Sequence, residues 1–241
     1  MKKREFIAQD LISKIYQQQF PNNKLPTQRD LADEYGVSRY TIQEALKRLS
    51  DIGIIYTVQG DGIYIKENIR SNPLIYNSMT ENSYEDIISK TIYLKKVSPS
   101  LDIQKTFGLK EDNLVWEFQR IRIVKYQITQ LENSVLPCNI FPILSEEDIE
   151  GSIQDYVQKR NYIISHYITN YKSTFISKDQ SKLLNCKKGS PAMEITNRGI
   201  LNDGTIYQYS KILALNYNCT YIIPFNKENY EQRQKGVSQN D

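Results

Sequence analysis

The sequence predicts an α+β protein built from two domains. Residues 4–65 combine short amphipathic helical patterns with one glycine-rich hairpin, whereas residues 91–215 contain consecutive strand-like segments joined by turns. The chain has 241 residues, of which 39% are apolar and 24% charged, so it is long enough to bury a substantial core. We therefore expect a small helical domain that ends in a hairpin, followed by an antiparallel sheet with helices packed on it.

Three helices are expected at the start of the chain. Residues 4–17 show helical apolar spacing, and Pro21-Asn22-Asn23 ends that pattern. Thr27 is a favourable N-cap for a second helix, which Gly36 ends, and Ser38 caps a third helix. The apolar face of the first helix comprises Phe6, Ile7, Leu11, Ile12 and Ile15, and that of the third comprises Val37, Ile42, Ala45, Leu46 and Leu49.

A hairpin follows the third helix. Residues 54–58 and 63–65 read as short strands, and Gly60 and Gly62 between them indicate a tight turn. The polar stretch that comes next has weak periodicity and is typical of a linker. The predicted organisation is a first domain at 1–68, a linker at 69–82, a second domain at 83–230 and a disordered tail at 231–241.

The second domain is expected to contain an antiparallel sheet, because strand-like segments follow one another with short turns such as Asn202-Asp203-Gly204. The predicted strands are residues 91–97, 114–124, 128–135, 163–176, 192–201 and 206–215. The predicted helices lie near residues 100–107, 145–149, 152–159 and 178–184.

Composition disfavours several classes of protein. No run of about 18 apolar residues is present, so a transmembrane helix is not expected. Cys138, Cys186 and Cys219 form no C-x-x-C pair, which favours a cytoplasmic protein with reduced thiols. His166 is the only histidine, which argues against a His-rich metal site and leaves any His-based triad resting on one candidate. We expect no metal, no cofactor and no catalytic residues. The net charge of +3 is too small to indicate nucleic acid by itself.

The order helix, turn, helix and hairpin predicts a winged helix-turn-helix that binds DNA. Arg39 lies at the start of the third helix, where its guanidinium can bond guanine, and Gln43 follows one turn later. The residues expected to face DNA are Thr27, Gln28, Arg29, Ser38, Arg39, Tyr40, Thr41, Gln43, Lys47, Gly60 and Gly62. Three alternatives remain open: Lys47 and Arg48 belong to a solvated face, Tyr64 packs within the hairpin, or the domain makes only protein contacts.

This N-terminal part resembles the winged helix of the GntR family. The resemblance covers about the first 66 residues and is carried by Leu25–Ala32, Tyr35–Leu46, Gly53–Ile55 and Gly60–Ile65. Three positions depart from the family pattern. Gln43 stands where arginine is usual, Gln28 replaces the usual glutamate, and Asp61 occupies a hairpin position that is often basic.

The second domain resembles the UTRA ligand-binding domain of the HutC-type branch of that family, over roughly residues 83–225. The segments that carry the resemblance are Trp116–Arg122, Gln130–Pro137, Phe141-Pro142, Ile149–Ile153, Leu201–Gly204 and Tyr207–Ser210. The resemblance implies a chorismate-lyase-like α+β fold, which supplies most of a homodimer interface and binds a small effector. The first part of the chain would bind double-stranded operator DNA.

Two arginines are the leading candidates for an anion site. Arg120 and Arg122 point to the same face of a strand, where two guanidiniums suit a phosphate. By resemblance, this pair grips the effector's anion, a Ser83-Tyr84 loop caps it, and Glu132 bonds a polar head such as sugar hydroxyls. The resemblance also places Ser165 and Tyr167 on a central strand that supplies hydroxyls. At Gln208 a glutamine replaces the common glutamate, as it does in trehalose-operon repressors.

Each of these residues also has a purely structural interpretation. Arg120 and Arg122 would then be a salt-bridge pair with Glu117 or nearby acids, and Glu132 would lie on a solvated strand edge. Ser165, Tyr167 and His166 would be ordinary strand residues.

The expected function is a repressor whose operator binding responds to a small anionic metabolite, most simply a phosphorylated sugar. Two alternatives follow from the same residues. One is an enzyme of chorismate-lyase-like fold fused to a DNA-binding domain, although no nucleophile–base pair or phosphate loop is present. The other is a constitutive DNA-binding protein without an effector.

Overall fold

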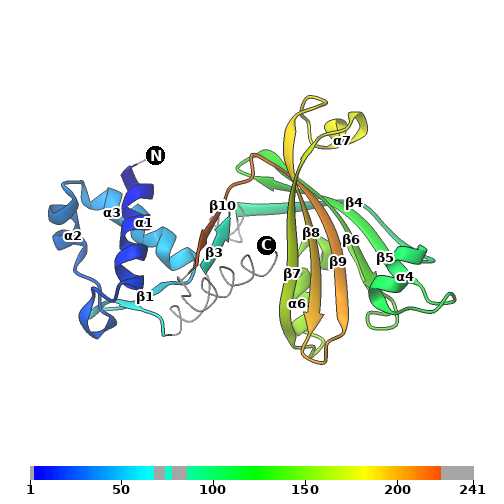
Figure 1. Cartoon of the computed structure of the whole chain (residues 1–241), viewed down its shortest axis with the longest axis horizontal. Helices are drawn as coiled ribbons and strands as arrows, with labels where there is room; N and C mark the ends of the chain where they lie inside the picture. The colour runs from blue at the N-terminus through cyan, green and yellow to red at the C-terminus, as the bar shows by residue number, and fades with distance from the viewer. Residues whose placement is uncertain (1–2, 68–73, 78–85, 224–241) are drawn as a thin grey trace, which may run out of the picture. The chain divides into compact units, whose positions relative to one another are not determined.

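The computed structural model describes residues 3–67, 74–77 and 86–223, which fall into two compact units. The first unit combines Met1–Ser83 with Asn218–Asp241, and the second is Tyr84–Tyr217. Figure 1 shows helices with a small hairpin in the first unit and a long-stranded antiparallel sheet in the second. The predicted α+β class is therefore confirmed.

The first unit is built around three helices, as the apolar spacing predicted. These are α1 (Lys3–Tyr16), α2 (Gln28–Tyr35) and α3 (Arg39–Asp51), with a short 3-10 helix at Pro21–Asn23. Their apolar faces form one core, in which Ile7, Leu11 and Ile42 are at most 2% exposed. Phe6 differs from the expectation, because its side chain is 52% exposed.

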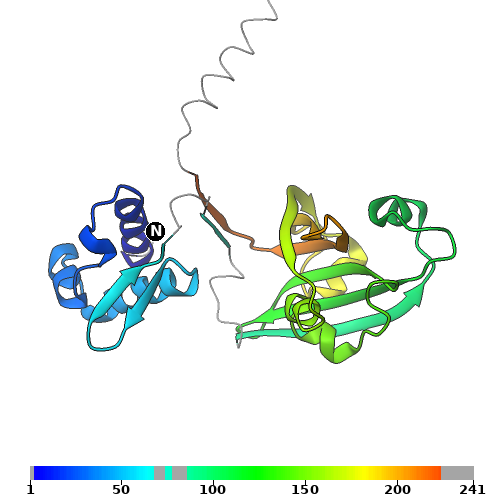
Figure 2. The same cartoon turned by 90° about the horizontal axis from the view of Figure 1, so that it is seen from below.

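A two-stranded hairpin, the wing, completes this core. Strands β1 (Ile55–Val58) and β2 (Gly62–Ile65) pair in antiparallel register, and their residues Ile55, Ile63 and Ile65 are buried in the same core. Figure 2 shows the wing lying beside the three helices. The backbone of Lys24 forms an isolated bridge with Tyr64, so the chain entering α2 runs alongside β2.

Two short strands alter the expected domain boundaries. Strand β3 (Leu74–Asn77), inside the predicted linker 69–82, pairs with β10 (Cys219–Ile222), inside the predicted second domain 83–230. Ile222 packs against the core of the first unit, so the chain returns to that unit after residue 217. The predicted tail at 231–241 lies outside the described residues.

The second unit contains one six-stranded antiparallel sheet with strand order β4-β5-β6-β9-β8-β7. Its strands are β4 (Ile87–Val97), β5 (Val115–Val124), β6 (Gln127–Pro137), β7 (Ile164–Phe175), β8 (Pro191–Leu201) and β9 (Ile206–Leu215). Strands β5, β6 and β9 lie in the interior of the sheet, whereas β4 and β7 lie at its edges. This order corrects the expectation that Ser165 and Tyr167 belong to a central strand.

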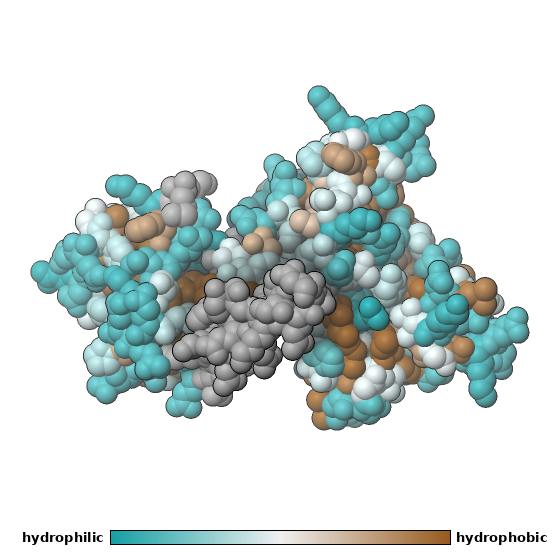
Figure 3. Space-filling model, viewed as in Figure 1, coloured by the Kyte–Doolittle hydropathy of each residue, from teal (hydrophilic) through white to brown (hydrophobic). Residues whose placement is uncertain are grey.

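Short serine-capped helices pack on the sheet, and the bounds are α4 (Leu101–Phe107), α5 (Glu146–Glu150), α6 (Ile153–Gln158) and α7 (Lys178–Leu183). One core joins Phe118 and Leu136 of the sheet to Ile149 of α5 and Val157 of α6. A second core contains Ile121, Leu131 and Leu213, with Leu184 after α7, and covers the other face because side chains alternate along a strand. Figure 3 shows brown and teal patches interspersed over the strands of this unit.

Candidate DNA-binding and effector sites

Helix α3 has the two-faced character that a recognition helix needs. Ser38 caps its first turn by accepting a hydrogen bond from the Thr41 backbone N–H at 3.2 Å, as predicted. Ile42, Ala45, Leu46 and Leu49 are buried, so the opposite face is left for a partner. The exposed residues of the predicted DNA set on this segment are Ser38, Arg39, Tyr40, Gln43 and Lys47, while Thr41 is half-buried.

The start of α2 carries a capping box between Thr27 and Asp30. The Asp30 N–H donates to the Thr27 hydroxyl at 3.2 Å, and that hydroxyl donates to an Asp30 carboxylate oxygen at 2.7 Å. The Asp30 carboxylate also accepts from the Thr27 N–H, so it occupies part of the helix start that was expected to face DNA. Arg29 is exposed and Gln28 is half-buried beside it.

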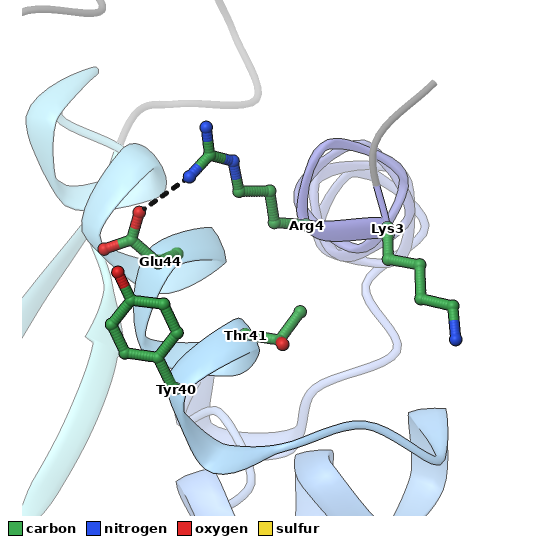
Figure 4. Close-up of a pocket in the computed structure, with 5 residues that line it drawn as sticks. All are labelled: Lys3, Arg4, Tyr40, Thr41 and Glu44. Carbon is green, nitrogen blue, oxygen red and sulfur yellow. Dashed lines mark hydrogen bonds and ion pairs between the residues drawn. The ribbon is translucent and has the colours of Figure 1, made fainter.

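One ion pair near the recognition helix was not predicted. Arg4 of α1 donates to the Glu44 carboxylate of α3 at 3.0 Å, across a hollow of about 360 Å³ also lined by Lys3, Tyr40 and Thr41. Figure 4 shows Arg4 reaching Glu44, while Lys3 extends away from it. Sequence spacing gives no signal for this contact, because the two residues lie 40 positions apart.

Other surface residues of this unit pair locally. Lys47 lies 2.7 Å from the Asp51 carboxylate one turn on, which is typical of a solvated helix face. Tyr64 stacks on Tyr56 with ring centroids 5.8 Å apart, so packing within the wing accounts for it. Gly60 is exposed at the wing tip and adopts a φ of 80°, a conformation that favours glycine.

On the sheet of the second unit, two arginines share one buried carboxylate. Glu132 of β6 lies opposite Arg120 of β5 and accepts its Nε–H at 2.8 Å. Arg122 Nη2 lies 3.3 Å from the same carboxylate oxygen. The side chains of Arg120 and Glu132 are only 2% and 3% exposed, whereas that of Arg122 is 23% exposed. Arg122 is therefore the member of this cluster that solvent reaches.

Arg120 also braces the turn between α5 and α6. One guanidinium nitrogen donates to the carbonyl oxygens of Ile149 and Gly151. Both arginines had been expected to grip an effector's anion, but Arg120 donates from Nε and Nη1 within the protein and its side chain is only 2% exposed. The structural alternative named Glu117 or nearby acids as the partner; Glu117 pairs with Lys95 at 3.0 Å, whereas Glu132 is the nearby acid that both arginines meet.

Burial and charge act in opposite directions on Glu132. Burial alone would raise the pKa of Glu132, but the charges of Arg120 and Arg122 outweigh it and lower that pKa to about 2. Ser134 donates to the other carboxylate oxygen at 2.7 Å, and Gln208 donates to the Ser134 hydroxyl at 3.4 Å. Glu132 is therefore a buried anion and not part of a solvated edge. Ser134 was missed, although its spacing from Glu132 places both on one strand face.

The remaining predicted effector residues are placed differently. Ser165 is exposed on β7 and its hydroxyl lies 3.0 Å from His166 Nδ1, so it is apart from the arginine cluster. Tyr167 bonds Tyr207 of β9 at 2.6 Å and accepts from Gln154 of α6 at 3.0 Å. The Ser83-Tyr84 loop lies outside the described residues.

Tyr207, which sequence reasoning missed, joins Tyr167 to the core of the second unit. The β8–β9 register passes from Gly199–Gln208 to Ile200–Ile206, so Tyr207 is the extra residue of a bulge. Its side chain is fully buried, and a Cβ added at Gly199 would lie 2.6 Å from its ring. The glycine therefore makes room for Tyr207.

Comparison with known proteins identifies both parts of the chain. Residues 3–65 match the model described as bacterial regulatory proteins, gntR family, and residues 84–215 match the UTRA domain. The chain is a GntR-family regulator with a UTRA domain. As the sequence resemblance implied, the GntR regulator is a DNA-binding transcription factor.

Similar proteins extend over most of the chain. The mannosyl-D-glycerate transport/metabolism system repressor MngR of Escherichia coli K12 is 28% identical over 200 residues, covering 79% of this chain and 82% of that protein. The transcriptional repressor NagR of Bacillus subtilis is 23% identical over 207 residues, covering 84% and 85%. The crystal structure of YydK from Bacillus subtilis shares the fold with a TM-score of 0.57, at 23% identity and coverage of 94% and 100%.

These comparisons exclude one of the two alternative functions, the enzyme fused to a DNA-binding domain. The related proteins are transcriptional regulators and not enzymes, so the fused-enzyme alternative is set aside. Among the described residues, no cluster of three or more His, Cys, Asp or Glu side chains is arranged to hold a metal. No described helix has the length and apolarity needed to cross a membrane.

Proposed function

We propose that this GntR regulator is a cytoplasmic, homodimeric repressor whose operator binding responds to a phosphorylated sugar. The observation that carries the effector assignment is the Arg122 guanidinium, which is partly exposed at the rim of a buried Arg–Glu–Arg cluster. A guanidinium donates paired hydrogen bonds to an anion such as phosphate. The related MngR carries the name of mannosyl-D-glycerate, which joins a sugar to an acid.

In this proposal the residues of the cluster have different tasks. Arg122 bonds the anion, while Glu132, Ser134 and Gln208 form the buried hydrogen-bonded chain that holds the Arg122 guanidinium in position. Arg120 positions Glu132 and the turn at Ile149, because its Nε and Nη1 donate there and its side chain is buried. The anion contact is therefore assigned to Arg122 alone, in place of the symmetric clamp by two arginines.

Calorimetry with a panel of sugar phosphates, their unphosphorylated sugars and mannosyl-D-glycerate tests the effector assignment. A hydrogen bond to a charged group contributes about 1.5–3 kcal/mol, so Arg122→Ala should weaken the best ligand by about 10- to 150-fold. Arg198→Ala is the matched control, since Arg198 is an exposed arginine on β8 of the same sheet. Equal binding by Arg122→Ala, or a best ligand without charge, would show that the anion site is misassigned.

The homodimer is proposed because two winged helices match a two-fold operator. The eleven residues from Thr27 to Gly62 predicted above supply its DNA-facing surface. A constitutive DNA-binding protein is the second candidate, and it would bind no member of the panel.

A further inference from the structure

Lys24 lies between two parts of the first unit that are proposed to face DNA. It precedes Thr27, the N-cap of α2, by three residues, and its backbone bridges to Tyr64 of the wing. The Leu25 N–H donates to the Ile63 carbonyl at 2.9 Å, which holds this segment against β2. A side chain at position 24 is therefore fixed relative to both the wing and the start of α2.

The Lys24 side chain reaches the tip of the wing. Its stem crosses Gly62, where an added Cβ would lie 2.7 Å from Lys24 Cε. The ammonium nitrogen lies 2.8 Å from one carboxylate oxygen of Asp61 and 5.1 Å from the centroid of the Tyr64 ring. Tyr64 donates its hydroxyl hydrogen to the other oxygen of Asp61. Both oxygens of Asp61 are thus engaged within the wing.

This arrangement solves an electrostatic problem at the wing tip. An acidic residue there would repel a DNA phosphate, and Asp61 occupies a position where the family is often basic. The hydrogen bond between Asp61 and Lys24 lowers the pKa of Asp61 and raises the pKa of Lys24, so both stay charged at neutral pH. The ammonium group has three N–H donors, and its side chain is 39% exposed. Donors therefore remain at the surface beside the neutralised carboxylate.

We propose that Lys24 is the residue through which the wing contacts a DNA phosphate, and that Asp61 is a positioning residue that holds the Lys24 ammonium at the wing tip. This inference rests on the proposed DNA-binding surface. It assigns the backbone contact to a residue before the helix-turn-helix, in place of a cation within the hairpin. Tyr64 serves the same cluster by orienting Asp61.

The test is the salt dependence of binding to the duplex that the full-length parent protein selects from a random-sequence library. The slope of log K against log salt concentration is negative, and each lysine–phosphate contact contributes about 0.9 to its magnitude. Lys24→Ala should reduce that magnitude by about 0.9 for each bound winged helix, and Lys24→Arg should retain it. Removing Asp61 as well, in Lys24→Ala/Asp61→Ala, should recover part of the lost affinity because an unmatched negative charge disappears.

Two further variants separate the possible failures. Lys182→Ala, which removes an exposed lysine 3.4 Å from Asp179 in the second unit, should leave the slope unchanged. Arg39→Ala should abolish the preference for the selected duplex. If Lys24→Ala keeps the parental slope while Arg39→Ala loses preference, the wing inference is overturned and the DNA surface stands. If neither variant differs from the parent, the DNA surface itself is wrong.

Discussion

At the residue scale, Glu132 balances the charge of two arginines on one side of the sheet. Its carboxylate is buried between Arg120 and Arg122, so a substitution that removes the carboxylate also removes the partner of both guanidiniums. A buried ion pair contributes little net stability, but removing one partner leaves a desolvated charge behind. Substitution of Glu132 should therefore lower the stability of the second unit more than substitution of an exposed carboxylate would.

Glu132→Gln should destabilise the second unit by about 3–5 kcal/mol at pH 7, because Arg120 keeps a buried charge without its partner. The folded pKa of Glu132 is lowered from 4.5 to about 2, so its contribution is present above pH 4.5 and is lost as the pH falls toward 2. The melting temperatures of parent and variant should thus converge as the pH falls over that range. Glu117→Gln is the control on β5, and a pH-independent difference for Glu132→Gln would contradict the expectation.

The close approach of Gly199 and Tyr207 gives a second residue-level prediction. Gly199→Ala places a Cβ 2.6 Å from the buried Tyr207 ring, and overpacking of this kind costs about 1–3 kcal/mol. Tyr207→Leu opens the space, so the cost of Gly199→Ala should shrink in that background. Chemical denaturation of the four proteins measures this coupling. Additive costs would mean that Tyr207 is not the obstacle.

Sequence alternation predicted part of the Arg–Glu–Arg cluster. Because side chains two residues apart share a strand face, Arg120 and Arg122 were expected together. The polar role expected of Glu132 came from the family resemblance. The use of Arg120 donors by Ile149 and Gly151 was unpredictable, since those contacts join residues 29 and 31 positions apart. Only the fold brings that turn over the sheet.

At the scale of elements, helix α3 is the part to which we assign DNA recognition. Arg39 is exposed in its first turn, after the Ser38 cap, and makes no contribution to the core. Arg39→Ala should leave the melting temperature unchanged and abolish specific operator binding, since a bidentate base contact is worth about 1–3 kcal/mol in each half-site. Footprinting of parent, Arg39→Ala and Arg198→Ala provides the measurement. An unchanged Arg39→Ala footprint would mean that another face of α3 enters the groove.

The regular elements were largely predictable because their periodicity is strong. Each of the six long strands and four short helices of the second unit appears near its expected position. Strands β3 and β10 were missed, since four residues carry too little pattern to distinguish a strand from a linker. Strand β7 was found but assigned to the centre of the sheet, because strand order depends on pairing between distant segments.

At the scale of the whole molecule, oligomeric state is the main expectation. One winged helix buries too little DNA surface for tight specific binding, so two copies should act together on a two-fold operator. Sedimentation at micromolar concentration should give the mass of a dimer, about twice 28.2 kDa. The same experiment on Arg39→Ala should also give a dimer, because that residue is assigned to DNA alone. A monomeric parent would contradict the proposed assembly.

The pairing of β3 with β10 makes the sensor an insertion. Residues 84–217 leave the first unit after β3 and rejoin it just before β10, and Asn77 and Cys219 are direct partners in that small ladder. The two ends of the inserted segment are therefore held close together by the β3–β10 ladder of the first unit. Domains whose ends are held close in this way can be exchanged as cassettes. Splicing another effector domain between residues 83 and 218 would make the same DNA-binding unit respond to a new metabolite. Truncation at residue 68 would instead remove the β3–β10 ladder from that unit.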